Sequence, residues 1–277
     1  EIGFIYINGH GVSRETIETA RTSAFNFFRA SELDKAAVSV STHHRGWLGP
    51  DRSKMQDDAK ADLKESFIWG SEHKMDKEVG DHYVRGDNKW PTFVPEMQES
   101  SNNYFNEIND VAWHLMRGFA IGLGLEEEFF LRNISQPLSR ASYVYYPQQP
   151  EELGEDQFGV APHSDFGLLT VLCQDAVGGL QVKDLKGNWV HAPPIEGSLV
   201  VNVGDLLSRW TDGVYRSTPH RVINQSGQDR LSLVLAFDPD PDTIIDARAI
   251  FGSNYVSKQE PISCGDYLTW RFKKAFS

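Results

Sequence analysis

From about Ser139 the chain consists of short β-rich runs separated by Gly, Pro and Asp turns, and this pattern limits the possible folds more than any other feature. The runs cover residues 142–146, 167–173, 180–182, 189–192, 198–203, 220–223 and 231–237. They are not separated by helices of the kind that connect parallel strands. The pattern therefore predicts a β-sandwich or a closed barrel.

The residues before this region carry helical periodicity. After a strand-like segment at 2–8, Ser13 is placed to cap a helix whose apolar side chains recur at three- and four-residue spacing. We expect a second helix over 95–123, an irregular polar stretch over about 42–90, and a closing helix over 264–276.

Nothing in the chain reads as a linker, a repeat or a low-complexity segment. We therefore expect an α+β fold in a single domain over residues 1–277. In this prediction, residues up to about 135 are mainly helical support, residues 136–262 form the β core, and residues 263–277 form the closing helix.

Composition limits the partners and the compartment. A formal net charge of −12 leaves little basic surface for nucleic acid or anionic membranes, so we expect a small-molecule ligand and neither of those partners. No apolar run reaches the ~18 residues of a membrane-spanning helix. The two cysteines, Cys173 and Cys264, form no disulfide framework or cysteine-rich zinc site, which favours a reducing, cytoplasmic location.

We also expect a monomer. Because a strand-like segment begins almost at Glu1, we expect the natural N-terminus, and any targeting signal in it, to lie outside this sequence.

Among the nine histidines, His163 alone has a carboxylate two residues later, Asp165. On an extended segment these two side chains project from the same face and can bind one ion. Two imidazoles and one carboxylate on one side of a metal leave open positions for O2 and a co-substrate, an arrangement typical of Fe(II). By itself the pair is weak, since about one such match is expected by chance and a salt-bridged His/Asp pair is the simpler interpretation.

Further signals follow in order along the chain. His220 comes directly after Pro219, at the start of an apolar strand. Ten and twelve residues later, Arg230 and Ser232 share one strand face, where a guanidinium and a hydroxyl form a clamp for a carboxylate. Arg230 alone could be a surface residue, but an unpaired Arg inside an apolar strand is costly and predicts an anionic partner.

At this point the sequence resembles the isopenicillin N synthase-like branch of the 2-oxoglutarate/Fe(II)-dependent dioxygenases. The resemblance covers nearly the whole chain. It rests on an opening strand and turn, on two helical-half motifs and on two barrel motifs: 3–12 (GFIYINGHGV), 44–47 (HRGW), 62–67 (DLKESF), 205–207 (DLL) and 216–223 (RSTPHRVI).

The resemblance implies a double-stranded β-helix (jelly roll) core with flanking helices. It implies that His163, Asp165 and His220 hold Fe(II) and act in catalysis. It also implies that Arg230, Ser232 and the hydroxyl of Tyr146 bind the distal carboxylate of 2-oxoglutarate. The expected reaction uses O2 to oxidise an unactivated C–H bond of a specialised metabolite, by hydroxylation, desaturation or ring formation, and releases succinate and CO2.

Three residues are candidates for the substrate pocket. Family members often carry a large aromatic residue six positions after the Arg of the clamp, where this chain has Ala236, so we expect a wider pocket and a bulkier substrate. The alternative is that Ala236 packs under a loop. By strand parity Arg140 could meet an acidic substrate or lie on the surface, and Phe67 could line the entrance or belong to the core.

Three alternatives remain. An Fe(II) oxidase of the same family could do without 2-oxoglutarate and use Arg230 and Ser232 to hold its substrate. Residues 62–67 and 158–193 are more similar to 2-oxoglutarate users.

A hydrolytic zinc enzyme would leave the clamp unexplained, and the chain has no His-Glu-x-x-His motif. A non-catalytic binding module is expected to have lost a ligand or clamp residue, whereas all five are present. The primary substrate and the reaction outcome do not follow from the sequence.

Overall fold

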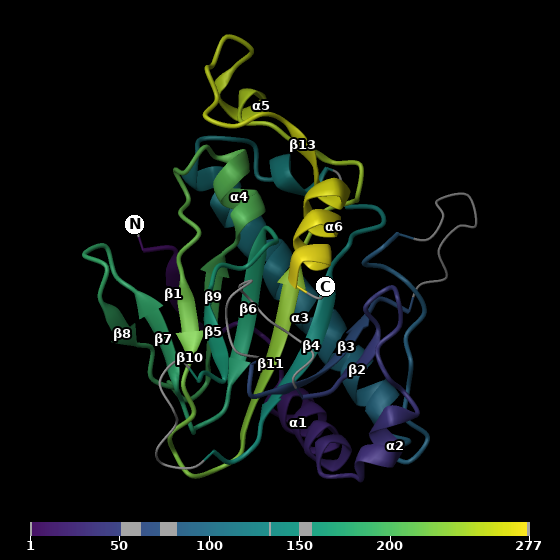
Figure 1. Cartoon of the computed structure of the whole chain (residues 1–277). Helices are drawn as coiled ribbons and strands as arrows, with labels where there is room; N and C mark the ends of the chain where they lie inside the picture. Colours follow the sequence, from purple (N-terminus) through teal and green to yellow (C-terminus); the bar gives the residue numbers. More distant parts are fainter. Residues whose placement is uncertain (1, 51–61, 73–81, 133, 150–156, 276–277) are drawn as a thin grey trace.

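The computed structural model describes residues 2–50, 62–72, 82–132, 134–149 and 157–275 (Figure 1). Within these ranges the largest unit is an antiparallel seven-stranded sheet. Its strands, in spatial order, are β1 (Phe4–Asn8), β9 (Ser198–Val203), β6 (Leu169–Gln174), β11 (Arg230–Phe237), β4 (Arg140–Tyr146), β3 (Glu65–Gly70) and β2 (Gly46–Leu48).

A second, four-stranded sheet faces part of the first. Its order is β5 (Val160–His163), β10 (His220–Val222), β7 (Leu180–Lys183) and β8 (Trp189–His191). Apolar side chains from both sheets pack together, including Val144 and Val200 from the large sheet and Val160, Leu180 and Val222 from the small one. Burying these residues from water holds the two sheets together.

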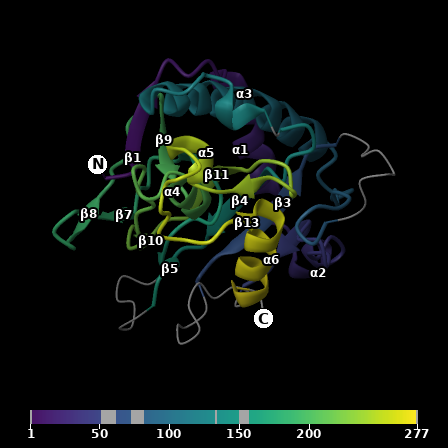
Figure 2. The same ribbon diagram turned by 90° about the horizontal axis from the view of Figure 1, so that it is seen from above.

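The helices pack outside this pair of sheets. They are α1 (Arg14–Phe28), α2 (Glu32–Ala36), α3 (Met97–Gly122), α4 (Asp205–Trp210), α5 (Arg248–Phe251) and α6 (Cys264–Ala275), with a 3-10 turn, η1, at Phe129–Leu131. The long helix α3 runs along one side of the sheets, next to α1 (Figure 2). A short strand pair, β12 (Ile244–Ile245) and β13 (Ile262–Ser263), precedes α6. The main core lies between α1, α3 and the large sheet.

Two facing antiparallel sheets with flanking helices confirm the predicted α+β class. The β-rich runs from 142 onward all form strands close to the expected bounds. Ser13 caps α1 as predicted, because its Oγ accepts a hydrogen bond of 2.9 Å from the amide of Thr16. The closing helix ends at Ala275 among the described residues, and Phe276, which we expected in it, lies outside them.

The prediction of an irregular, helix-side stretch over 42–90 is wrong at β2 and β3, which extend the large sheet. All six residues of β3 are buried. The alternation of apolar and polar residues that identifies a half-exposed strand is therefore missing. No helix in the described ranges combines the length and apolar composition needed to cross a membrane.

Candidate metal centre

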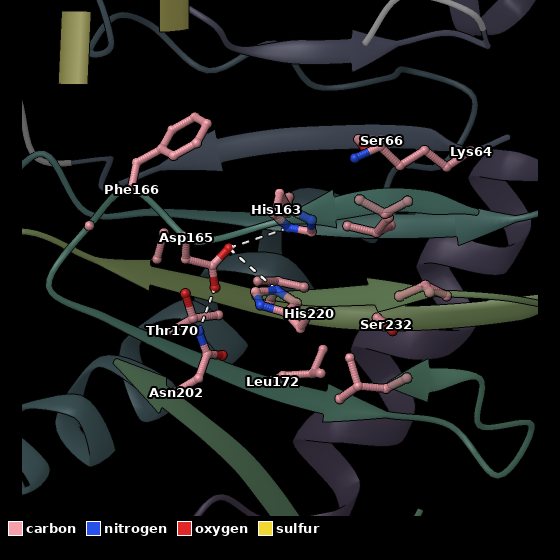
Figure 3. A pocket seen from close by; sticks show the side chains of 18 of the residues that line it. Lys64, Ser66, His163, Asp165, Phe166, Thr170, Leu172, Asn202, His220 and Ser232 are labelled. Atoms are coloured by element: carbon pink, nitrogen blue, oxygen red, sulfur yellow. Dashed lines mark hydrogen bonds and ion pairs between the residues drawn. The ribbon is translucent and has the colours of Figure 1, made fainter. Parts of the chain in front are cut away.

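His163, Asp165 and His220 converge where β5 ends and β10 begins in the small sheet (Figure 3). His163 ends β5 and His220 begins β10, and the two are directly paired across these antiparallel strands. Asp165 Oδ1 lies 3.7 Å from Nε2 of both His163 and His220. In the part of the chain that the structure describes, these residues form the one group of three or more His, Cys, Asp or Glu side chains placed to share an ion.

In each of the three side chains, the nitrogen or oxygen atom that faces away from the other two side chains is hydrogen-bonded to the protein. Nδ1 of His163 lies 2.8 Å from the carbonyl oxygen of Ala161, and Nδ1 of His220 lies 3.2 Å from that of Thr218. A carbonyl only accepts, so each Nδ1 carries the proton and each Nε2 has a free lone pair for a metal. Asp165 Oδ2 accepts a hydrogen bond of 2.7 Å from Asn202 Nδ2.

Electrostatics keep His163 and Asp165 in the forms that bind a metal. Burial, the neighbouring His220 and, more weakly, the ammonium of Lys64 lower the pKa of His163 to about 3, so its imidazole is neutral near pH 7. Burial opposes ionisation of Asp165. The two imidazoles and hydrogen bonds from Asn202 and Thr170 nevertheless bring its pKa to about 2, so it remains a carboxylate.

The turn after Asp165 is fixed by close backbone packing. The amide of Asp205 donates a 2.7 Å hydrogen bond to the carbonyl oxygen of Asp165. Gly167 has no side chain here because a Cβ would lie 2.2 Å from the carboxylate of Asp238. A larger residue would therefore displace the loop that carries the carboxylate ligand.

The three residues line a cavity of about 200 Å³ between the sheets. Arg230 and Ser232 line it too, from β11. Arg230 is 0% exposed, and its Nε donates to the carbonyl oxygen of Gly178. Among the described residues, Arg230 Nη1 and Nη2 and Ser232 Oγ have no hydrogen-bond partner.

These unpartnered donors fit a carboxylate. A fully buried guanidinium whose outer nitrogens make no hydrogen bond is costly unless a ligand supplies the acceptor. The ring of Tyr146 stacks on Arg230, 4.7 Å from centroid to guanidinium carbon. Burial raises the pKa of Tyr146 to about 12, so its hydroxyl stays protonated as a donor. The residues present therefore fit a dicarboxylic keto acid that reaches the metal at its other end.

Strand alternation places Ala236 as predicted. It lines the cavity on the same face of β11 as the clamp, whereas Phe237 is fully buried in the core. Arg140 also lines the cavity but is no surface residue, since its Nη1 donates at 2.8 Å to the fully buried Asp238. Its guanidinium stacks on the ring of Phe272 at 4.6 Å.

The interpretation of Phe67 as a pocket residue is wrong. Phe67 is 1% exposed and packs in the main core, 5.0 Å from the ring of Phe27. The reason is the strand period of two: in β3 the cavity is lined by Ser66 and Ile68, which project opposite to Phe67.

Sequence reasoning missed several residues that line the cavity, among them Lys64, Asn202 and Phe272. Asn202 did carry a signal, because it is the one amide in the otherwise apolar run of β9. Lys64 and Phe272 carried none, since nothing local distinguishes them from other lysines and aromatic residues.

Two family models match the chain. Residues 135–239 match the model described as the 2OG-Fe(II) oxygenase superfamily. Residues 1–93 match the model described as "non-haem dioxygenase in morphine synthesis N-terminal". His163, Asp165, His220, Arg230 and Ser232 all lie within the first match.

Relatives of established name align over most of the chain. The 2-oxoglutarate-Fe(II) type oxidoreductase hxnY of Emericella nidulans is 31% identical, over 99% of this chain and 81% of the relative. Validamycin A dioxygenase of Streptomyces hygroscopicus subsp. limoneus is 34% identical, over 87% of this chain and 69% of the relative.

Solved structures share the fold. A full-length Neurospora crassa protein, crystallised in complex with alpha-KG and thymine, is 28% identical and superposes with a TM-score of 0.86, over 98% of this chain and 87% of that one. JOX2 in complex with 2OG, Fe and JA is 26% identical, with a TM-score of 0.82 over 98% of this chain and 77% of that one. The likeness confirms the expected jelly-roll core with flanking helices.

Proposed function

Since this chain belongs to the 2-oxoglutarate/Fe(II) oxygenase superfamily, we propose that it oxidises an unactivated C–H bond of a small-molecule metabolite, with release of succinate and CO2. It is a dioxygenase that uses Fe(II), 2-oxoglutarate and O2. In this proposal His163, Asp165 and His220 hold the iron. Arg230, Ser232 and Tyr146 bind the distal carboxylate of 2-oxoglutarate.

One observation carries this assignment. The buried, unpartnered outer nitrogens of Arg230 and the hydroxyl of Ser232 open into the same cavity as the three metal-binding side chains. A zinc hydrolase has no use for such a clamp, and a non-catalytic module has no need of an intact ligand set. A dicarboxylic keto acid needs both the metal-binding side chains and the clamp, because its 2-oxo acid end chelates the metal while its distal carboxylate pairs with a cation.

When bound, the iron and 2-oxoglutarate supply the oxidising power for the reaction. The chain itself has other tasks. The clamp orients the keto acid, and the hydrogen bonds behind each ligand fix which atoms face the metal. Apolar walls, among them Leu48, Ile68 and Phe166, keep water away from the reacting carbon.

The test is succinate formation from 2-oxoglutarate under Fe(II) and O2, with a panel of candidate metabolites. The purified protein should form succinate only when iron is present, and His163→Ala and Asp165→Ala should abolish it. His191→Ala, an exposed histidine, is the matched control and should retain full turnover. Unchanged succinate formation in the His163→Ala and Asp165→Ala variants would contradict the proposed function.

Product mass separates the reaction outcomes. A gain of one oxygen atom indicates hydroxylation, whereas a loss of two hydrogen atoms indicates desaturation or ring closure. Substrate oxidation without succinate formation would favour the 2-oxoglutarate-independent oxidase.

The substrate is proposed to be bulky beside Ala236. This residue and Arg140 are directly paired on β11 and β4, at the end of the cavity away from Arg230. Ala236→Phe should fill this space and raise the KM for the primary substrate, while the KM for the keto acid stays unchanged. An unaltered substrate KM would contradict a role for this space in binding.

A further inference from the structure

Lys64 is a largely buried cation beside the cavity that belongs neither to the three metal-binding side chains nor to the clamp. It lies just before β3, and its side chain is 9% exposed. It lines the same cavity as the three metal-binding residues. Figure 3 shows its side chain pointing in the direction of His163.

The ammonium group lacks a close acceptor among the described residues. Its one ion-pair partner there is Asp62, whose Oδ2 lies 3.7 Å from Nζ, beyond hydrogen-bond distance. Asp62 is itself engaged by the protein, because its Oδ1 accepts a 3.0 Å hydrogen bond from the amide of Ala161. An ammonium group has three donors, so one that lines the cavity without a close protein acceptor can donate to an anion bound there.

Strand pairing places Lys64 between the clamp and the metal. Glu65 pairs with Tyr145, and the next residue, Tyr146, pairs with Arg230. The backbone of Lys64 therefore lies near the clamp end of the cavity, and its side chain extends from there toward the metal ligands. The positive charge of Lys64 also acts on the imidazole of His163.

We propose that Lys64 binds the carboxylate of the keto acid at its metal end, so that 2-oxoglutarate is held by one cation at each end. This inference rests on the proposed function and adds a binding residue to it. Arg230 recognises the distal carboxylate, and Lys64 recognises the 2-oxo acid group.

The experiment uses two probes that differ in one end. 2-Oxoglutarate has both carboxylates, whereas pyruvate has the 2-oxo acid end alone. Each is titrated calorimetrically into the Mn(II)-loaded protein, in which no turnover occurs. Lys64→Met removes the charge at nearly constant length, and Arg230→Met does the same at the other end. Lys186→Met, at an exposed lysine, is the matched control.

Lys64→Met should weaken the binding of both probes, by about 10- to 100-fold, as expected for loss of a hydrogen bond to a charged group. Arg230→Met should weaken 2-oxoglutarate binding by a similar factor and leave pyruvate binding unchanged. Lys64→Gln, a second neutral variant, should repeat the pattern of Lys64→Met, and melting of the metal-free proteins identifies a variant that has lost its fold.

Equal affinity of Lys64→Met and the wild type for both probes overturns the inference. So does weaker binding of 2-oxoglutarate alone, because Lys64 would then belong to the distal clamp. Failure of the proposed function looks different: the wild type itself would bind no Mn(II), or would bind Mn(II) and no 2-oxoglutarate.

Discussion

At the scale of single residues, Asn202 holds the carboxylate of Asp165 in the proposed metal centre. It is 3% exposed, and its amide group holds Oδ2 of Asp165. The other oxygen, Oδ1, is thereby directed toward His163 and His220. Without this hydrogen bond the carboxylate of Asp165 can rotate. Metal binding must then fix its orientation, and this weakens the affinity for the metal.

Asn202→Ala should therefore weaken metal binding by about 10- to 100-fold. The measurement is the dissociation constant of Mn(II), obtained by calorimetry. Asn188→Ala is the control, since Asn188 makes a comparable amide-to-carboxylate hydrogen bond with Asp184 on an exposed turn. Equal metal affinity in Asn202→Ala and the wild type would contradict a role for this amide in orienting the ligand.

At the scale of secondary structure, β3 is attached to the helical layer by a buried ion pair. Glu65 Oε2 accepts hydrogen bonds from Lys35 Nζ at 2.6 Å and from Trp47 Nε1 at 2.7 Å. Lys35 belongs to α2 and Trp47 to β2, so one carboxylate joins three elements. Because the next residue of β3, Ser66, lines the cavity, this attachment also fixes one cavity wall.

Glu65→Ala should lower the free energy of unfolding by about 3–5 kcal/mol, because it leaves the ammonium group of Lys35 buried without its carboxylate. Urea denaturation measures the effect. The matched control is Glu126→Ala, which breaks the exposed ion pair with Arg132 and should cost less than about 1 kcal/mol. If both variants lost the same stability, β3 would not depend on this ion pair.

The sequence predicted seven of the strands from β4 onward, because each is a short β-rich run between turn residues. It did not predict β5, which is four residues long and contains Pro162, nor the two-residue strands β12 and β13. It failed at β2 and β3 for a physical reason. A strand buried on both faces has no alternation of apolar and polar residues, and ESFIWG has no clear apolar period. Its place in the sheet depends on pairing with β4, which lies far along the chain.

At the scale of the whole molecule, the cavity assembles residues that the sequence keeps apart. That His163, Asp165 and His220 lie together could be predicted, because the His163/Asp165 pair, His220 and the clamp residues follow one another in the order that the family resemblance implies. Lys64 and Phe272 could not be predicted. Contacts across the fold decide which of the 27 Lys and Arg side chains, and which of the 16 Phe side chains, line the cavity.

His44 also connects distant parts of the chain and should make stability depend on pH. Its ring lies 5.0 Å from that of Tyr83 and 4.8 Å from that of Phe272 on α6. Burial, and then the charges of Arg140 and Arg45, lower the pKa of His44 to about 4. Below the usual pKa of about 6.5, the unfolded chain therefore binds a proton that the folded protein does not.

The metal-free protein should lose about 2 kcal/mol of stability through His44 between pH 7 and pH 5. His44→Gln, which cannot titrate, should lose correspondingly less over the same interval. Urea denaturation of both proteins at the two pH values provides the comparison. An identical pH dependence would show that His44 is protonated equally in the folded and unfolded states.

The measurement that tests the central claim most directly is the binding of Fe(II), under anaerobic conditions, to the wild type and to three single variants. The wild type should bind one Fe(II) per chain. His163→Ala, Asp165→Ala and His220→Ala should each lose that binding while keeping their fold, and the control His191→Ala should bind as the wild type does. Full iron binding by any of the three ligand variants would contradict the assignment of His163, Asp165 and His220 as the metal centre.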